Sequence, residues 1–136
     1  GFQIVTGPKK VPDQHYATEF IKTEKEYRCW FAFNETLCAR RIAINTSNTK
    51  IPCRSEWGYA FIGEDQCTLL RKETLDAAKA IGLQTGAADV LWKNGYYFLE
   101  LNSAPSVDHR TVRRFFQDAI KRYVKELKVT NETNKC

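Results

Sequence analysis

The amino-acid sequence predicts an α+β fold, in which an antiparallel sheet has helices packed on one face. Three observations support this fold class. Strand-like runs joined by short polar segments fill the first third of the chain, a hairpin signal lies at Asn94-Gly95, and helical periodicity begins at Val112. The order of strands, helix, hairpin and helix is typical of a sheet covered by helices.

The first three strands are expected at residues 15–21, 26–33 and 36–44, where strand-forming residues lie between short polar turns. Residues 45–60 then form a long segment rich in loop-forming residues. An ordered loop of this length in a compact domain is usually functional or mobile.

Two helices are expected. The first covers residues 69–81, where alanines favour the helix and Gly82 is placed to end it. The second is amphipathic, because apolar residues recur at helical spacing. They are Val112, Phe115, Phe116, Ala119, Ile120, Tyr123, Val124 and Leu127. No aromatic residues interleave with the arginines and lysines of its polar face, so we expect that face to be solvated and not to bind nucleic acid.

A two-residue turn at Asn94-Gly95 determines the expected pairing of the strands around it. A type I′ turn needs positive φ at both central residues, which Asn and Gly adopt readily. Counting outward from this loop opposes Asp89 to Glu100, whose Cβ atoms would lie roughly 4.5–5.5 Å apart. The other face of the hairpin is expected to belong to the core and carries Val90, Trp92, Tyr97, Leu99 and Leu101.

Opposed carboxylates repel each other, so a further interaction must offset the repulsion between Asp89 and Glu100. Asn102 lies two residues beyond Glu100, and strand alternation puts its amide oxygen on the same face. Two carboxylates and an amide oxygen form a hard ligand set that suits Mg²⁺ or Mn²⁺. Three alternatives stay open: both carboxylates are solvated, a lysine or arginine neutralises one, or a longer loop or bulge separates them.

Composition and charge exclude several classes of protein. The chain has 136 residues, of which 43% are hydrophobic and 12% aromatic, as in a folded single domain. The net charge of +5 favours anionic partners in general. No apolar run approaches the roughly 20 residues of a membrane span and no signal-peptide pattern is present, so we expect a cytoplasmic protein without a membrane partner. The five cysteines form no CxxC pair and are expected to be reduced thiols.

The hairpin resembles the signature of the ATP-grasp superfamily. In residues 96–106 a strand ends in Glu, a hydrophobic residue and Asn, and a short segment then closes with Pro. An acidic residue at the place of Asp89 and an Ala-rich helix before it, here residues 75–82, belong to the same pattern. Upstream, residues 18–21 resemble the hinge strand of that family, and residues 26–28 resemble the acidic-x-Arg motif of its amino-acid ligase branches.

This resemblance covers most of residues 15–125 and implies the larger, carboxy-terminal lobe of an ATP-grasp fold. The type it resembles is a carboxylate-amine ligase of the protein or amino-acid glutamate ligase branch. The implied reaction uses ATP and Mg²⁺ or Mn²⁺ to convert a carboxylate into an acylphosphate, which an amine then displaces to form a C–N bond. In that pattern Glu100 would bridge two metal ions, Asp89 would hold one and Asn102 the other.

The resemblance also implies roles for residues before the hairpin. The backbone at Glu19, Phe20 and Ile21 would hold the adenine of ATP. Arg28 would bind phosphate or acylphosphate oxygens, because a planar guanidinium can donate two parallel hydrogen bonds to them. The alternative is that Arg28 pairs with Glu26 or with a carboxylate of the site.

Other arginines are candidates for the same role. Arg54 is the stronger one, because related ligases often place a substrate- or phosphate-binding arginine in the corresponding loop. Arg40 and Arg41 are weaker candidates, and the sequence does not distinguish between them.

Complete ATP-grasp enzymes also have a smaller lobe that supplies lysines and a glycine-rich loop over the triphosphate, and neither feature is visible in this sequence. We therefore expect residues 1–14 to be a linker or the trailing edge of a missing lobe, residues 15–128 to be the ATP-grasp lobe, and residues 129–136 to be a polar tail. The expected partners are ATP, a carboxylate and amine substrate pair, and the missing lobe. The alternative function is a non-catalytic basic module that binds a nucleotide or nucleic acid.

Overall fold

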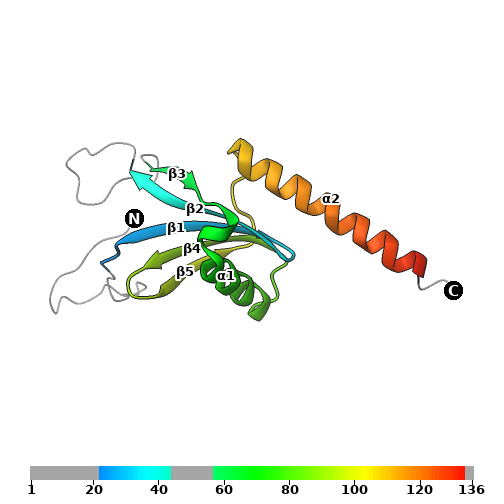
Figure 1. The fold of residues 1–136 in the computed structure, drawn as a ribbon, viewed down its shortest axis with the longest axis horizontal. Helices are drawn as coiled ribbons and strands as arrows, with labels where there is room; N and C mark the ends of the chain where they lie inside the picture. The colour runs from blue at the N-terminus through cyan, green and yellow to red at the C-terminus, as the bar shows by residue number, and fades with distance from the viewer. Residues whose placement is uncertain (1–21, 44–56, 134–136) are drawn as a thin grey trace, which may run out of the picture.

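The structure is a computed structural model in which residues 22–43 and 57–133 are described. Within these residues, five antiparallel strands form one sheet in the order β3-β2-β1-β4-β5 (Figure 1). The elements are, in chain order, β1 (Lys25–Ala32), β2 (Glu35–Ala43), β3 (Trp57–Phe61), the 3₁₀ helix η2 (Glu64–Gln66), α1 (Thr68–Ala80), β4 (Thr85–Trp92), β5 (Tyr96–Asn102) and α2 (Arg110–Thr133). The predicted α+β class with an antiparallel sheet is therefore confirmed.

Three of the expected elements, β1, β2 and α1, lie within one residue of their predicted bounds. The expected strand at residues 15–21 lies outside the described residues, as does most of the expected loop at 45–60. The end of that loop prediction is wrong, because residues 57–61 form β3 and pair with β2. Tyr59 and Phe61 alternate with small residues and pack against Trp30, so this segment forms an edge strand.

The strand β1 is apolar on both faces, which explains where the two helices lie. All four side chains of residues 29–32 are buried, so each face of the sheet needs a cover. On one face Leu70 of α1 shares a buried cluster with Cys38. On the opposite face Val112 of α2 shares a second cluster with Trp30. The helices therefore cover opposite faces, whereas the sequence analysis placed both on one face.

The helix α1 ends where the sequence predicts. The backbone N–H of Gly82 donates to the carbonyl of Lys79, and the N–H of Leu83 donates to the carbonyl of Ala78. These two bonds form a Schellman motif, in which the residue after the helix adopts the left-handed conformation. Gly82 has a φ of 74°, which a glycine adopts without steric cost.

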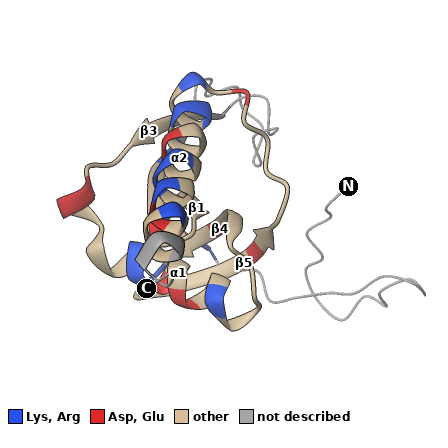
Figure 2. Cartoon of the chain, turned by 90° about the vertical axis from the view of Figure 1, so that its right-hand side faces the viewer, with Lys and Arg blue, Asp and Glu red and all other residues tan. Residues whose placement is uncertain are grey.

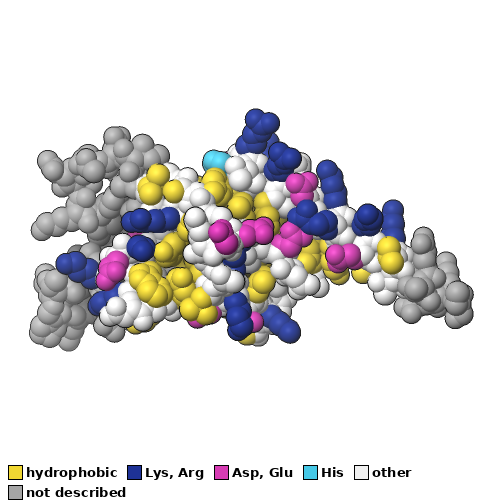
Figure 3. All heavy atoms as spheres, viewed as in Figure 1, with side chains coloured by type: hydrophobic (Ala, Val, Ile, Leu, Met, Phe, Trp, Pro, Cys, Tyr) yellow, Lys and Arg dark blue, Asp and Glu magenta, His cyan; other side chains and the backbone are white. Residues whose placement is uncertain are grey.

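The helix α2 is longer than the predicted 112–127 and projects beyond the sheet (Figure 1). Val112 and Ala119 in its first half are buried. Tyr123 stacks on Phe33 of the β1–β2 turn, with ring centroids 3.8 Å apart. Beyond this contact the apolar stripe is exposed. Lysine and arginine residues recur along the helix (Figure 2), and their side chains project from it (Figure 3).

In the β4–β5 hairpin Asp89 lies opposite Glu100, as predicted, but the strand pairing that leads to this differs from the predicted pairing. Trp92 pairs with Tyr96, so the loop has three residues and the predicted two-residue loop is wrong. Asn94 in this loop has a φ of 55°. A β-bulge next to Asp89 shifts the pairing back by one residue, and Asp89 then pairs with Glu100. The longer loop and the bulge cancel each other.

The same bulge overturns part of the predicted core. Leu99 is the extra residue of the bulge and is 60% exposed. Tyr97 pairs with Leu91 and is 44% exposed, because a shift of one residue turns a side chain to the other face of a sheet. The remaining predicted core residues of the hairpin are buried or partly buried: Val90, Trp92 and Leu101.

Candidate functional site

Three charged residues lie side by side on one face of the sheet. Arg28 on β1 pairs with Asp89 on β4, and Asp89 pairs with Glu100 on β5. Directly paired residues project their side chains to the same face, and neighbouring strands lie about 4.8 Å apart. We call Arg28, Asp89 and Glu100 the charged row.

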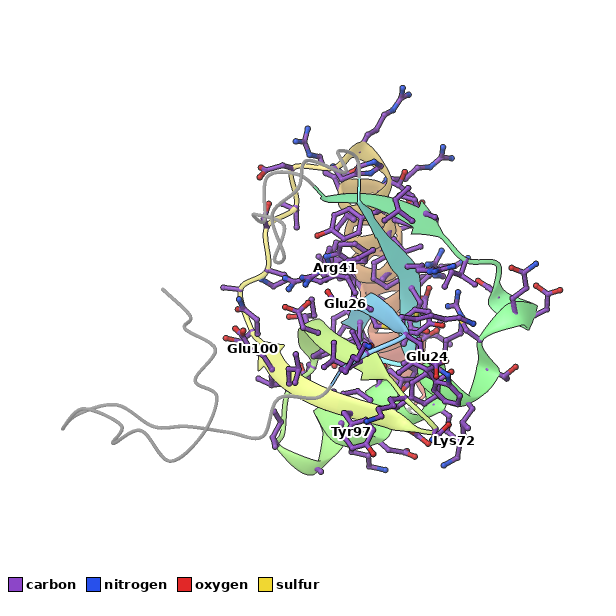
Figure 4. All side chains as sticks on the ribbon, turned by 90° about the vertical axis from the view of Figure 1, so that its left-hand side faces the viewer. Glu24, Glu26, Arg41, Lys72, Tyr97 and Glu100 are labelled. Atoms are coloured by element: carbon purple, nitrogen blue, oxygen red, sulfur yellow. The ribbon has the colours of Figure 1, made fainter. Side chains whose placement is uncertain are left out.

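Two arginines bind the central carboxylate of this row. Oδ1 of Asp89 accepts hydrogen bonds from Nη1 of Arg28 at 2.7 Å and from Nη2 of Arg41 at 2.8 Å. Arg41 comes from β2, and its Nη1 lies 3.8 Å from Oε2 of Glu26 (Figure 4). Asp89 is only 5% exposed, so these charge-assisted bonds compensate for the loss of its hydration. The structure thus shows the alternative in which arginines neutralise one of the opposed carboxylates.

The other carboxylate of the row is open to solvent. Glu100 is exposed at the β5 edge of the sheet (Figure 4), and within the described residues its side chain makes no hydrogen bond or ion pair. Two residues along, Oδ1 of Asn102 accepts a hydrogen bond from the backbone N–H of Ala104 at 2.8 Å. An amide oxygen has two lone pairs, so Asn102 retains one acceptor position.

On the same face of the sheet, an apolar cluster lies next to the charged row. Trp30 lies two residues beyond Arg28 on β1, and it belongs to the cluster that Val112 of α2 completes. Ala39, which pairs with Arg28, is part of the same cluster. The charged row therefore lies at the edge of a packed core, which limits the movement of its backbone.

Comparison with solved structures shows a related architecture. The ATP-grasp ligase PsnB, complexed with a phosphomimetic variant of its minimal precursor, Mg and ADP, superposes with a TM-score of 0.54 over 76% of this chain and 34% of that chain, at 15% sequence identity. The described fold is ATP-grasp-like.

Two further structures resemble the chain less closely. PsnB with its minimal precursor gives a TM-score of 0.48 over 66% of this chain and 29% of that chain, at 17% identity. The macrocyclase MdnC from Microcystis aeruginosa MRC, bound with the precursor peptide MdnA, gives 0.46 over 63% and 27%, at 20% identity. The chain thus spans about a third or less of each matched protein. No family model and no curated protein sequence matches it.

The oxygen donors on this face of the sheet are of the kind that a hard divalent cation prefers. Asp89 and Glu100 supply carboxylate oxygens and Asn102 supplies an amide oxygen, which Mg²⁺ prefers over nitrogen or sulfur. Within residues 22–43 and 57–133, no three His, Cys, Asp or Glu residues are grouped to hold a metal ion. Mg²⁺ usually keeps several waters and uses one or two carboxylates together with substrate phosphates, so this small donor set suits it.

The structure tests only part of the predicted site. Glu19, Phe20, Ile21 and Arg54 lie outside the described residues, so their roles stay predictions. Arg28 lies beside the central carboxylate, as its alternative pairing predicted, and its role as an anion-binding residue also stays a prediction.

The structure shows which of two adjacent arginines lies near Asp89, a question that the sequence left open. Arg40 and Arg41 are adjacent on β2, so their side chains point to opposite faces of the sheet. Arg41 reaches Asp89, whereas Arg40 is exposed on the other face. The sequence contains one feature that could have separated them. A short turn at Phe33-Asn34 pairs Arg28 with Ala39, and strand alternation then puts Arg41 on the same face as the charged row.

No described helix is long and apolar enough to cross a lipid bilayer.

Proposed function

We propose that this chain is the metal- and nucleotide-binding lobe of an ATP-dependent ligase that joins a carboxylate to an amine. The observation that carries the proposal is the opposition of Asp89 and Glu100 across β4 and β5, with Asn102 on the same face. The ATP-grasp-like fold supports it, and PsnB, the neighbour with the TM-score of 0.54, was solved with Mg and ADP.

The residues of the site would act mainly by positioning and charge. Bound Mg²⁺ ions would neutralise negative charge on the transferring phosphoryl group. The side chain of Glu100 is free of other partners among the described residues, so it would be available to hold the bound Mg²⁺. Arg28 donates to Asp89 and would place a positive charge beside the phosphate oxygens of a bound nucleotide, where fixed charges lower the barrier for phosphoryl transfer.

The substrate pair is proposed to be a carboxylate and an amine. PsnB was solved with a variant of its minimal precursor, which makes a precursor of that kind a candidate for the molecule that carries the carboxylate. The chain covers 34% of PsnB, and we propose that a preceding lobe supplies the lysines and the glycine-rich loop of the complete enzyme.

Metal and nucleotide binding test this proposal directly. We expect Mn²⁺ to bind the full chain in an electron paramagnetic resonance titration, and ADP binding measured by calorimetry to require Mn²⁺ or Mg²⁺. Glu100→Gln keeps the size of the side chain but removes a carboxylate ligand, so it should weaken Mn²⁺ binding by about tenfold or more.

The matched control is Glu64→Gln, which makes the same charge change at an exposed residue of η2. It should bind Mn²⁺ as the wild type does. Equal Mn²⁺ binding by the wild type and Glu100→Gln, or no Mn²⁺ binding by the wild type, would contradict the proposal. ADP binding that is indifferent to metal would instead favour the non-catalytic nucleotide-binding module.

A further inference from the structure

Three exposed apolar side chains form a narrow stripe on α2. Ile120 is 47% exposed, Val124 44% and Leu127 46%. A spacing of four and then three residues places them on one face of the helix, as in the alternating d and a positions of a coiled coil. We call these three residues the α2 seam.

The seam is open because the rest of the domain contacts other parts of the helix. Val112 in the first half of α2 is buried. Tyr123 stacks on Phe33, and Nε of Arg122 donates to Oε1 of Glu35 at 2.6 Å. These contacts hold the helix where it leaves the sheet (Figure 1), so a partner would meet a helix that is already formed. A preformed surface loses little conformational entropy on binding.

The charged residues directly beside the seam are both positive. When Val124 is an a position, Ile120 and Leu127 are d positions, and Lys121 and Lys128 are the e positions that flank the seam. Both lysines are exposed, and within the described residues neither forms an ion pair. Their charge is therefore available to a partner that covers the seam.

The acidic residues of this part of α2 cannot balance these lysines across the seam. Asp118 and Glu126 lie about 100° or more around the helix axis from each seam residue. Charges at the flanking positions of paired helices select the partner, because opposite charges attract across the seam and like charges repel. The seam therefore favours a helix that presents glutamate or aspartate to the two lysines.

Two other occupants fit the seam less well. A second copy of the chain offers no carboxylate at its own flanking positions, which hold the same two lysines together with Tyr123 and Thr130. An anionic membrane supplies negative charge, but helices that bind there immerse a broad apolar face that often carries aromatic residues. The aromatic neighbours of the seam, Phe116 and Tyr123, already pack against the domain.

We propose that the α2 seam is a docking site for an amphipathic helix of a partner protein, which carries aliphatic residues at its a and d positions and glutamate or aspartate beside them. This surface uses no metal or nucleotide, so the inference does not depend on the proposed function. It assigns a role to exposed apolar residues that the charged row does not involve.

A synthetic helix of the stated chemistry tests the proposal. The acidic probe is a labelled peptide of about three heptads with leucine at the a and d positions and glutamate at the e and g positions. The basic probe has lysine in place of glutamate. Without metal or nucleotide, the fluorescence anisotropy of the acidic probe should rise to saturation as the full chain is added, and the basic probe should bind about tenfold more weakly or worse. Raising NaCl from about 0.05 to about 0.5 M should weaken the acidic probe by about threefold or more, because exposed charges are screened.

A substitution in the seam locates the binding site. Leu127→Asp places a charge among the apolar contacts, so it should weaken binding of the acidic probe by about tenfold or more. Leu69→Asp is the matched control, because Leu69 of α1 is also an exposed leucine on a helix, at 56%. It should bind the acidic probe as the wild type does.

A charge reversal beside the seam tests the electrostatic part of the proposal. Lys128→Glu should weaken the acidic probe by about fivefold or more and strengthen the basic probe. Lys125→Glu makes the same change at an exposed residue of α2 outside the flanking positions, so it should alter either affinity by less than about twofold.

Near-ultraviolet circular dichroism verifies the fold of each variant, and Lys128→Glu carries the test if Leu127→Asp does not fold. The inference is overturned if Leu127→Asp and Leu69→Asp bind the acidic probe equally, or if the two probes bind the wild type equally. It is also overturned if the chain does not bind the acidic probe. In that case, self-association in sedimentation velocity that Leu127→Asp abolishes would assign the seam to a second copy, and Leu127-dependent binding to vesicles of phosphatidylcholine and phosphatidylserine would assign it to an anionic membrane.

Discussion

Asp89 shows how much of the site a single residue determines. Among the described residues it is the one charged residue that is buried, and two guanidinium groups converge on it. The sequence could place Asp89 opposite Glu100, because alternation along a strand is a local rule. It could not choose the arginines, since Arg41 reaches Asp89 from a strand that is not its neighbour.

The buried thiols lead to a prediction about pH at the same scale. Cys29, Cys38 and Cys67 are free and buried in the core under α1. A hydrogen bond with Cys29 and burial raise the pKa of Cys38, and burial raises the pKa of Cys67. The native protein therefore keeps the thiols of Cys38 and Cys67 protonated at pH values where the unfolded chain ionises them.

Because the native state then binds more protons than the unfolded state, the free energy of unfolding should fall as the pH rises from about 8 to 10, by up to about 1.4 kcal/mol per pH unit for each thiol. Urea unfolding followed by tryptophan fluorescence measures this slope. The variant Cys38→Ser cannot ionise at residue 38 in this range, so its slope should be shallower. Equal slopes for the variant and the wild type would contradict the assignment to Cys38.

At the scale of elements, the hairpin shows which predictions depend on distant packing. The sequence correctly predicts strands on both sides of Asn94-Gly95, because turn chemistry is local. The three-residue loop and the bulge were not predictable, since both depend on which residues β5 buries against α1. With the bulge, Phe98 and Leu101 pack into the cluster under α1, while Leu99 turns to solvent. The prediction that Asp89 lies opposite Glu100 was correct only because the longer loop and the bulge shift the register in opposite directions.

Gly86 in strand β4 is packed so closely by neighbouring atoms that a larger residue would clash with them. A Cβ at Gly86 would lie 2.6 Å from the backbone oxygen of Asn102 and 2.6 Å from Cζ of Phe31. Neither atom can move freely, because Asn102 ends β5 and Phe31 is fully buried. Gly86→Ala should therefore lower the free energy of unfolding by roughly 1–3 kcal/mol, as overpacking of a core does.

Gly63→Ala is the matched control for Gly86→Ala. Its Cβ would meet only the side chains of Asp65 and Gln66, which are exposed and can move away. Urea unfolding should show a loss of less than about 0.5 kcal/mol for this variant. If both substitutions lowered the free energy of unfolding by a similar amount, the contacts around Gly86 would not be the cause of the destabilisation.

At the scale of the whole molecule, α2 divides into a packed half and a projecting half. The same apolar periodicity runs through both halves, so the sequence predicted one continuous apolar stripe. The sheet covers only the first half of that stripe, and the stacking of Tyr123 on Phe33 is near the limit of the covered part. The exposed residues of the stripe are Ile120, just before this contact, and Val124 and Leu127 beyond it. The spacing of apolar residues shows which of them share a face of a helix. It does not show how much of that face the sheet covers.

This division predicts unequal effects for two truncations in one helix. Val112 is fully buried beneath the sheet, so Val112→Ala should lower the free energy of unfolding by roughly 1–3 kcal/mol. Leu127 is 46% exposed, so Leu127→Ala should change it by less than about 0.5 kcal/mol, since little packing is lost and alanine favours a helix. Urea unfolding at two protein concentrations measures both effects. A loss at Leu127 equal to that at Val112 would contradict the division, and if that loss grew with protein concentration, it would show that the projecting half packs against a second copy of the chain.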